Sequence, residues 1–292
     1  MKIGLNLDAF RDEPLESVIP ECLKMGIKNV ELWASNLDNL GEPTHKWSYF
    51  NKDLAKAKKQ LDDAGLKVCI TSFGFGLDYN CCQNVERFKK ELIKTIETAK
   101  YFDCPYVIHH IRDIVRKYNA DVELVRPYWE EPIKKAEELG VTLLLENEPM
   151  DMTCCPENML LFLKTFDSPN FKCNFDAANY YLACNEPFPY AYEMLKPYIK
   201  HVHIKNMMRY NYKYCPSKTL IGLDMTRNYE GQQAYRVRLA DGVLNNEGFL
   251  KALHRDGFDG VVSLENHGTH QEMFDMCSAD ADYLRATGFF EE

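Results

Sequence analysis

The 292-residue sequence has no long hydrophobic run and no excess of basic charge. No apolar stretch approaches the roughly 18 residues that a membrane-spanning helix needs, so no membrane partner is expected. Acidic residues outnumber basic ones by 44 to 35, which gives a net charge of −9 and argues against nucleic acid as a partner. The first residues, MKIGLNLDAFRDE, reach acidic side chains too early for a signal peptide, and we expect a cytoplasmic location.

Signals based on cysteine and glycine are also missing. The 11 cysteines are odd in number and no two have CxxC spacing, which favours reduced thiols over a disulfide framework or a zinc cluster. The turn after the first apolar segment, DAFRDEP, has no glycine, whereas a dinucleotide-binding sheet carries a Gly-rich phosphate turn there. The loop after the last strand candidate also lacks a glycine-rich phosphate cradle, which favours an unphosphorylated substrate.

Four short apolar segments each end in a side chain that can bind a metal. In Val141–Pro149, VTLLLENEP, five apolar or β-branched residues precede a glutamate, as in a strand that is buried on both faces and opens into a site. The pattern recurs in Asn170–Asp176 (NFKCNFD), Ile199–Lys205 (IKHVHIK) and Gly260–His267 (GVVSLENH). A fold that gathers these four strand ends would make one site from Glu146, Asp176, His203 and Glu265.

Strand-like and helix-like segments alternate along the whole sequence, eight of each. Such alternation means parallel strands with right-handed crossovers, and eight units in roughly 250–300 residues fit a closed (β/α)8 TIM barrel. An open doubly wound sheet is the second choice. No linker or internal repeat interrupts the pattern, so residues 1–292 are expected to form a single domain. The expected strands are Lys2–Asp8, Asn29–Trp33, Lys67–Phe73, Pro105–His110, Val141–Glu146, Asn170–Asp176, Ile199–Lys205 and Asp259–Leu264. The expected helices are Leu15–Met25, Lys52–Ala64, Val85–Phe102, Ala120–Leu139, Pro156–Phe166, Pro187–Lys196, Glu247–Arg255 and Gln271–Ala286.

The spacing between the strand ends predicts a long insertion after the seventh strand. Glu146 and Asp176 are 30 residues apart, and Asp176 and His203 are 27 apart, one strand–helix unit in each case. His203 and Glu265 are 62 apart, about twice that. The surplus is Asn206–Asn245, and a long loop at the carboxyl end of a barrel strand is usually functional. A lid over the barrel and an interface in a homo-oligomer explain this insertion equally well.

The four strand-end residues predict a divalent metal site. In a TIM barrel the carboxyl ends of the strands surround one mouth, so these side chains would face a common point. Three carboxylates and one imidazole suit Mn²⁺, our first choice, or Mg²⁺ or Co²⁺ better than a thiolate-type zinc site, although Zn²⁺ stays open. Any single strand-end acid is more often a helix cap or a salt-bridge partner, but a set of four is harder to explain that way.

The same segments resemble the xylose-isomerase-like barrel superfamily of sugar isomerases and epimerases. The resemblance covers nearly the whole chain and is strongest in VTLLLENEP, NFDAAN, HVHIKN, GFLKALHRDGFDGVVSLENH and GIKNVELW. It implies a TIM barrel whose Glu146, Asp176, His203 and Glu265 hold one divalent metal. Because the second histidine of HVH is the ligand in that family, His201 is left as a packing residue or a support for the site.

The resemblance also implies residues that bind the substrate. Arg209 stands six residues after the histidine ligand, where the ketose epimerases have an arginine, and is expected to hold a substrate hydroxyl. Lys205 precedes an asparagine where several members have Lys-Asp. Asn179 stands where the epimerases have a histidine. This departure and the long insertion count against a specific ketose-epimerase assignment.

Further strand ends supply weaker candidates. Trp33 and Phe73 can stack on the apolar face of a sugar ring. Glu31 ends the second strand, and His109 and His110 end the fourth. Packing in the core or at the barrel rim explains each of them at least as well. His267 and His270 follow the last strand and are either supports for the site or simply exposed.

The site predicts proton transfer beside a carbonyl. A metal that chelates neighbouring carbonyl and hydroxyl oxygens stabilises an enediolate, and Glu146 and Glu265 are the expected acid and base. This chemistry serves an isomerase or epimerase of a sugar or polyol, which is the first interpretation. The alternative is a lyase on the same scaffold, such as an inosose dehydratase or an enzyme that eliminates from keto-glycosides. A nuclease resembling endonuclease IV and a barrel that binds without turnover rank lower.

Overall fold

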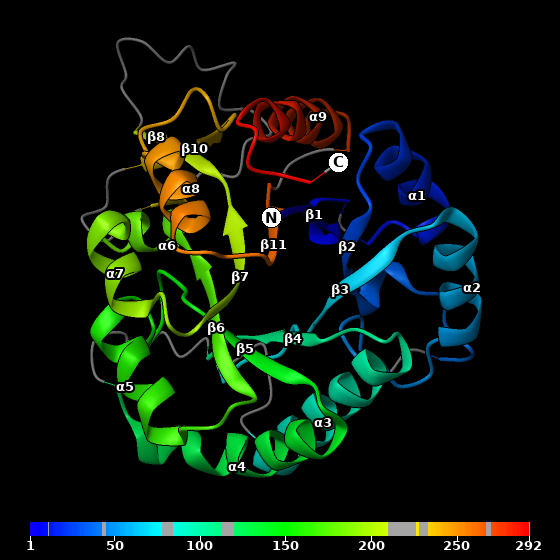
Figure 1. Cartoon of the computed structure of the whole chain (residues 1–292). Coiled ribbons are helices and arrows are strands. Elements are labelled where there is room, and N and C mark those ends of the chain that lie inside the picture. The colour runs from blue at the N-terminus through cyan, green and yellow to red at the C-terminus, as the bar shows by residue number, and fades with distance from the viewer. Residues whose placement is uncertain are drawn as a thin grey trace.

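The computed structural model describes residues 1–10, 12–42, 45–77, 84–111, 120–209, 226–227, 233–266 and 270–291. Within these residues, eight parallel strands close into a barrel in the order β1-β11-β7-β6-β5-β4-β3-β2. Helices form a ring outside the strands (Figure 1). The predicted (β/α)8 TIM barrel is confirmed, and the open sheet is excluded because β1 pairs with both β2 and β11.

The strands and helices agree closely with the segments expected from the sequence. The barrel strands are β1 (Lys2–Asn6), β2 (Asn29–Trp33), β3 (Lys67–Ser72), β4 (Tyr106–His109), β5 (Thr142–Glu146), β6 (Phe171–Asp176), β7 (Ile199–Ile204) and β11 (Val261–Leu264). The helices are α1 (Leu15–Lys24), α2 (Leu54–Ala64), α3 (Val85–Tyr101), α4 (Val122–Leu139), α5 (Pro156–Phe166), α6 (Ala177–Leu182), α7 (Tyr192–Leu195), α8 (Asn246–Arg255) and α9 (His270–Ala286). Short 3₁₀ turns follow β1 and β2, at Leu7–Phe10 and Ala34–Asn36.

Several helices begin and end with the residues that capping requires. The Asp121 side chain accepts from the backbone N–H of Leu124 at the start of α4, which satisfies one of the unpaired donors of the first turn. Gly140 ends the same helix in the left-handed conformation, with φ of 67°, which costs glycine little because it has no Cβ. Pro127 and Pro132 both lie inside α4, so they do not start it. The chain therefore enters β5 directly after a glycine stop.

The inside of the barrel is filled separately from the layer under the helices. Ile70, Ile108 and Leu144 form a buried cluster of their own, apart from the main core. Side chains two residues apart on a strand point to the same face, so Leu144 and Glu146 share the inner face of β5. The barrel axis is thus plugged by aliphatic side chains below the point where the polar strand ends begin.

Two segments differ from the expectation. The residues after β6 form the short helix α6, which was not predicted. The expected helix Pro187–Lys196 is instead a short irregular segment, η4 (Pro187–Ala191), in which Phe188 has an extended backbone, followed by α7. The insertion after β7 contains a small antiparallel sheet of β8 (Asn206–Arg209), β10 (Gln233–Val237) and β9 (Thr226–Arg227). Residues 210–225 and 228–232 of the insertion lie outside the described residues, so whether it acts as a lid or an interface stays a prediction.

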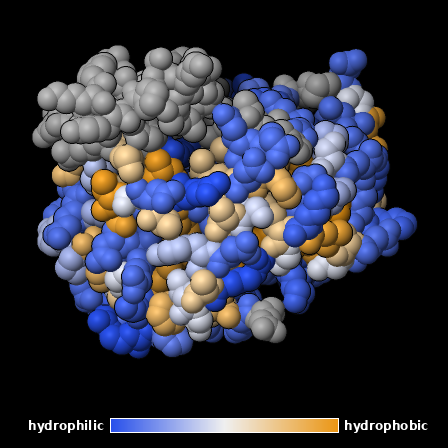
Figure 2. Space-filling model, turned by 90° about the horizontal axis from the view of Figure 1, so that it is seen from above, coloured by the Kyte–Doolittle hydropathy of each residue, from blue (hydrophilic) through white to orange (hydrophobic). Residues whose placement is uncertain are grey.

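The surface combines polar and apolar residues. The face shown in Figure 2 is largely hydrophilic, with smaller hydrophobic areas between. Apolar atoms contribute more than half of an ordinary protein surface, so these areas need no special explanation. Among the helices that the structure describes, none combines the length and hydropathy needed to cross a bilayer.

Candidate metal centre

Four side chains meet at the carboxyl end of the barrel, as the sequence predicts. Glu146 ends β5, Asp176 ends β6, His203 lies near the end of β7, and Glu265 directly follows β11. These four strands are consecutive around the barrel, in the order β5-β6-β7-β11. The inserted segment separates β7 from β11 in the sequence but not in the barrel. One ligand atom from each residue lies within 4.8 Å of the other three. The residues are buried, with 1%, 0%, 1% and 9% of their surface exposed in the order given.

His203 lies between carboxylates on both sides of its ring. Its Nδ1 is 2.7 Å from Oε1 of Glu146 and 3.6 Å from Oε2 of Glu265. Its Nε2 is 2.9 Å from Oε2 of Glu31, which comes from β2. Burial alone would lower the pKa of His203, but the carboxylates of Glu146, Glu31 and Glu265 hold it well above its usual value. Without a bound metal, the ring is therefore an imidazolium that donates on both sides.

Asp176 and Lys205 form the second buried ion pair of the site. Nζ of Lys205 is 2.5 Å from Oδ2 of Asp176 and also contacts Oε2 of Glu265. Oδ2 of Asp176 and the Lys205 ammonium form an ion pair, but their geometry does not meet the angular requirements of a hydrogen bond. Burial alone would raise the pKa of Asp176, but Lys205 and His203 hold it below its usual value. The second oxygen of Asp176 accepts from the backbone N–H of Asn179 and caps α6.

Glu146 is the carboxyl group of the site whose pKa is raised. Burial raises the pKa of Glu146 to about 7, against the effect of His203, and Glu265 and Asp176 raise it further. A buried carboxylate is costly unless a cation or a proton accompanies it. This position is therefore prepared for additional positive charge.

The donor set fits a divalent cation. Four buried acids (Glu31, Glu146, Asp176 and Glu265) share two cations, the side chains of His203 and Lys205. Three carboxylates and one imidazole nitrogen are ligands that Mn²⁺, Mg²⁺, Co²⁺ and Zn²⁺ accept. A dication placed among them would replace the proton on Nδ1 of His203 and supply the missing positive charge.

The loop between β5 and α5 holds Glu146 and Asp176 in place. The Asn147 side chain accepts from the backbone N–H of Asp176 and donates to its carbonyl, at 2.9 and 2.8 Å. Oγ1 of Thr153 donates to Oδ1 of Asp151 at 2.6 Å and accepts from the backbone N–H of Glu148 at 2.8 Å. The sequence analysis did not single out these residues, because the contacts depend on loop geometry that has no sequence period.

His110 and Glu148 extend the site toward its opening. Nδ1 of His110 is 3.3 Å from Oε2 of Glu146 and 3.3 Å from Oε1 of Glu148. His110 was among the weaker candidates, whereas Glu148 was missed. Its spacing could have revealed it, since it stands two residues after Glu146 and therefore faces the same side of an extended chain.

Three further residues were predicted to bind the substrate: Trp33, Asn179 and Arg209. Nε1 of Trp33 donates to Oδ1 of Asn6 at 2.7 Å, and Nδ2 of Asn6 lies 3.5 Å from Oε1 of Glu265. Nδ2 of Asn179 donates to the carbonyl of Asn147, so this side chain braces the loop. Roles of Trp33 and Asn179 in substrate binding stay predictions. The side chain of Arg209 lies outside the described residues.

His109 and Phe73 take the packing role. His109 is fully buried against the ring of Trp129, and burial lowers its pKa to about 3. Phe73 packs edge-on against Phe88 of α3. Both side chains therefore belong to the layer between barrel and helices. His267 lies outside the described residues, and so does the side chain of His270.

Comparisons with known proteins agree with this architecture. The sequence profile described as "Xylose isomerase-like TIM barrel" matches residues 19–288. The chain belongs to this family. A search of curated protein sequences gave no match. The resemblance seen in the sequence motifs is thus confirmed for the xylose isomerase-like family, while the reaction is not settled by it.

Solved structures share the fold over almost the full length. One is the probable 3-DHS dehydratase AsbF from Bacillus anthracis, 20% identical, with a TM-score of 0.69 over 98% of this chain and 99% of that one. Another is the IolI protein with a bound zinc atom, 18% identical, with a TM-score of 0.70 over 100% of both chains. A third is the 3-keto-D-glucoside 4-epimerase YcjR from E. coli, 16% identical, with a TM-score of 0.67 over 99% of both chains. At these identities the likeness establishes the barrel and leaves the activity open.

A cavity of about 520 Å³ lies at the opposite end of the barrel. Its lining includes Tyr106, Ile199 and Gly260, which stand at or next to the amino ends of β4, β7 and β11. TIM-barrel enzymes have their active sites at the carboxyl ends of the strands, and the amino ends serve stability. We therefore place the functional site at the four strand-end residues and not in this cavity.

Proposed function

We propose that this protein is a divalent-metal-dependent isomerase or epimerase of a sugar or sugar-like keto substrate. One observation carries the proposal: Glu146, Asp176, His203 and Glu265 bring ligand atoms within 4.8 Å of one another at the carboxyl end of a TIM barrel. Enzymes on this scaffold act at that end. Mn²⁺ is the first ion to test, with Mg²⁺, Co²⁺ and Zn²⁺ as alternatives.

Glu146 and Glu265 are the proposed acid and base. A bound divalent ion would polarise a substrate carbonyl and stabilise the negative charge that develops beside it. The two glutamates come from β5 and from the end of β11 and approach Nδ1 of His203 from different strands. Each has two oxygens, so one can serve as a ligand while the other accepts or returns a proton.

Lys205 and His110 are the proposed substrate-orienting groups. The ammonium of Lys205 has three donors, and its contacts to Asp176 and Glu265 leave a third to hold a substrate oxygen. His110 faces Glu146 and Glu148 on the opposite side. Arg209, Asn179 and Trp33 complete the proposed substrate contacts on the strength of the family resemblance.

A lyase is the second candidate. Return of the proton to the other face gives epimerisation, return to the neighbouring carbon gives isomerisation, and loss of a β-hydroxyl gives dehydration. His110 and Glu148 favour the third outcome, because together they supply a second proton donor beside Glu146.

A substrate screen in deuterated water tests the proposal. Free ketoses, inososes and keto-glycosides are incubated with the Mn²⁺-loaded protein, and the products are examined by NMR and mass spectrometry. The proposal expects deuterium at the carbon beside the carbonyl of the converted substrate. A product that keeps all its oxygens, with a shifted carbonyl or an inverted carbon, supports the isomerase or epimerase. A product that has lost water supports the lyase. Loss of water leaves a carbon–carbon double bond and adds no hydrogen to carbon, so the deuterium criterion applies to the isomerase and the epimerase. Conversion to an isomer or epimer without solvent hydrogen at any carbon would point to hydride transfer instead.

A further inference from the structure

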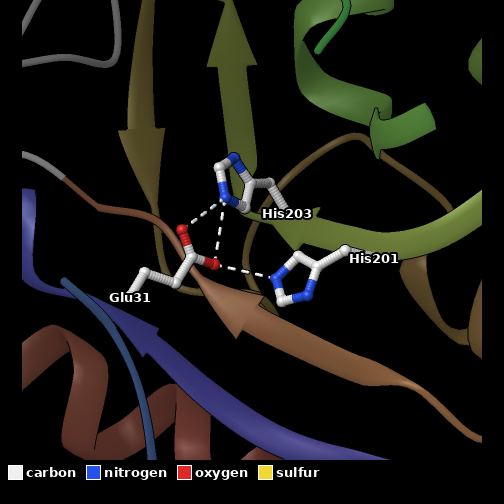
Figure 3. Close-up of side chains that lie close together, drawn as sticks. All are labelled: Glu31, His201 and His203. Carbon is white, nitrogen blue, oxygen red and sulfur yellow. Dashed lines mark hydrogen bonds and ion pairs between the residues drawn. The ribbon is translucent and has the colours of Figure 1, made fainter. Parts of the chain in front are cut away.

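A buried cluster of Glu31, His201 and His203 shares His203 with the proposed metal site. The two histidine side chains converge on the Glu31 carboxylate (Figure 3). Oε1 of Glu31 is 2.8 Å from Nε2 of His201, and Oε2 is 2.9 Å from Nε2 of His203. All three side chains are at most 1% exposed. The Glu31 carboxylate therefore interacts with two imidazole rings and not with solvent.

His201 holds the Glu31 carboxylate through a defined tautomer. Nδ1 of His201 has no hydrogen-bond partner among the residues that the structure describes. An unpaired lone pair costs less than an unpaired N–H, so the proton resides on Nε2, which faces both Glu31 and Oγ of Ser263 at 2.8 and 2.9 Å. His201 is therefore a neutral donor that fixes the position of Glu31.

Gly4 makes the room for this cluster. It lies on β1, between β2, which carries Glu31, and β11, which carries Ser263. A Cβ at Gly4 would lie 2.4 Å from Oγ of Ser263 and 2.6 Å from Cγ1 of Val261. Any larger residue at position 4 would therefore displace the Ser263 side chain, whose hydroxyl lies 2.9 Å from Nε2 of His201.

We propose that Glu31 is a positioning residue that fixes His203 for metal binding, with His201, Ser263 and Gly4 as its support. Because Nε2–H of His203 is donated to Glu31, the lone pair of Nδ1 is the one available on the side of Glu146 and Glu265. A carboxylate behind a metal-bound imidazole fixes its tautomer and strengthens it as a ligand. This inference rests on the proposed metal site but requires no particular reaction.

Metal affinity of the substrate-free protein tests it. Glu31→Gln keeps the side-chain shape and an oxygen acceptor but removes the charge. We expect Mn²⁺ and Co²⁺ to bind this variant roughly 10–100-fold more weakly, the range found when such outer partners are lost. The matched control is Glu91→Gln, which changes a buried glutamate of α3 bonded to Ser48 and should leave the affinity unchanged.

Two further measurements separate positioning from a purely structural role. The visible absorption of bound Co²⁺ reports the ligand geometry and should change in Glu31→Gln but not in Glu91→Gln. A structural role alone would lower the melting temperature of the metal-free protein and leave the affinity of the folded fraction unchanged. If Glu31→Gln does not fold, Ser263→Ala and Gly4→Ala replace it, and both should weaken binding in the same direction.

The outcomes distinguish this inference from the proposed function. Absence of metal binding to the unaltered protein would overturn both. Tight binding to the unaltered protein with equal affinity in Glu31→Gln, or in Ser263→Ala and Gly4→Ala, would overturn the positioning role alone. Weakened binding with an altered Co²⁺ spectrum would support it whatever the substrate is.

Discussion

Nδ1 of His203 lies 2.7 Å from Oε1 of Glu146, although 57 residues separate them in the sequence. The other Glu146 oxygen lies 3.3 Å from Nδ1 of His110. Glu146 therefore connects the proposed ligand cluster with the groups nearer the opening. A carboxylate in this position can hold a metal with one oxygen and exchange a proton with the other.

Replacing either proposed acid–base glutamate should impair chemistry more than metal binding. Glu146→Gln and Glu265→Gln keep the shape and one ligand oxygen but remove most of the basicity. We expect kcat to fall by roughly 10²–10⁴-fold, the usual effect of losing a general base. Metal content is measured on the same samples. Activity close to that of the unaltered enzyme in a fully metal-loaded variant would remove that glutamate from the mechanism.

Removing Lys205 should destabilise the metal-free protein and make it more dependent on metal. Lys205→Met would leave the buried carboxylates of Asp176 and Glu265 without their shared cation. Breaking a buried pair in this way costs about 3–5 kcal/mol. A divalent ion would restore part of that charge balance, so added Mn²⁺ should raise the melting temperature of the variant more than that of the unaltered protein. Equal shifts would show that Lys205 and the metal do not share the carboxylates.

The buried carboxyl group of Asp280 is expected to make the stability of the protein depend on pH. It lies on α9, where it accepts from the backbone N–H of Leu239 at 2.7 Å and from Nδ2 of Asn266 at 3.1 Å. Burial raises its pKa from 3.8 to about 6, with Arg238 opposing and Asp241 adding to the shift. Because the folded state binds this proton more tightly, the stability it contributes is present below about pH 4 and is lost as the pH rises through 6.

Asp280→Asn should remove that dependence. The amide keeps an oxygen for the Leu239 N–H and carries no charge to bury. Relative to the unaltered protein, the variant should gain stability between pH 4 and pH 7, by about 3 kcal/mol at most, since one pKa unit corresponds to roughly 1.4 kcal/mol. Urea unfolding of both proteins at pH 4, 5.5 and 7 measures the difference. A stability difference that is constant with pH would mean that folding does not raise the pKa of Asp280.

The barrel and its four strand-end residues could be predicted because the signals are local. A strand buried on both faces, such as VTLLLE, is an unbroken apolar run, and the first polar residue after it marks the mouth. The spacing of about one strand–helix unit between Glu146, Asp176 and His203 then follows from the repeat itself. The position of the insertion followed from the same arithmetic.

Other parts of the site could not be read from local pattern. The helix α6 has only six residues, too few to show a helical period, and it forms because Asp176 caps it. Glu31 and His201 are 170 positions apart in the sequence, so nothing in either segment distinguishes a bonded pair from two packing residues. Gly4 looks like any glycine in a strand until the side chain of Ser263 is placed beside it. These features depend on which strands become neighbours when the barrel closes.

Metal titration of Asp176→Asn tests the central claim most directly. Asparagine keeps the oxygen that caps α6 through the Asn179 N–H but removes the ligand charge. The control is Asp53→Asn. Asp53 caps α2 by accepting from the backbone N–H of Lys56, as Asp176 caps α6, but it is not one of the proposed ligands. The account predicts one tightly bound Mn²⁺ per chain in the unaltered protein and in Asp53→Asn. It predicts a loss in Asp176→Asn larger than the roughly 10–100-fold that an outer partner costs. Saturable binding of equal strength in Asp176→Asn, or no binding of any of the four ions to the unaltered protein, would contradict it.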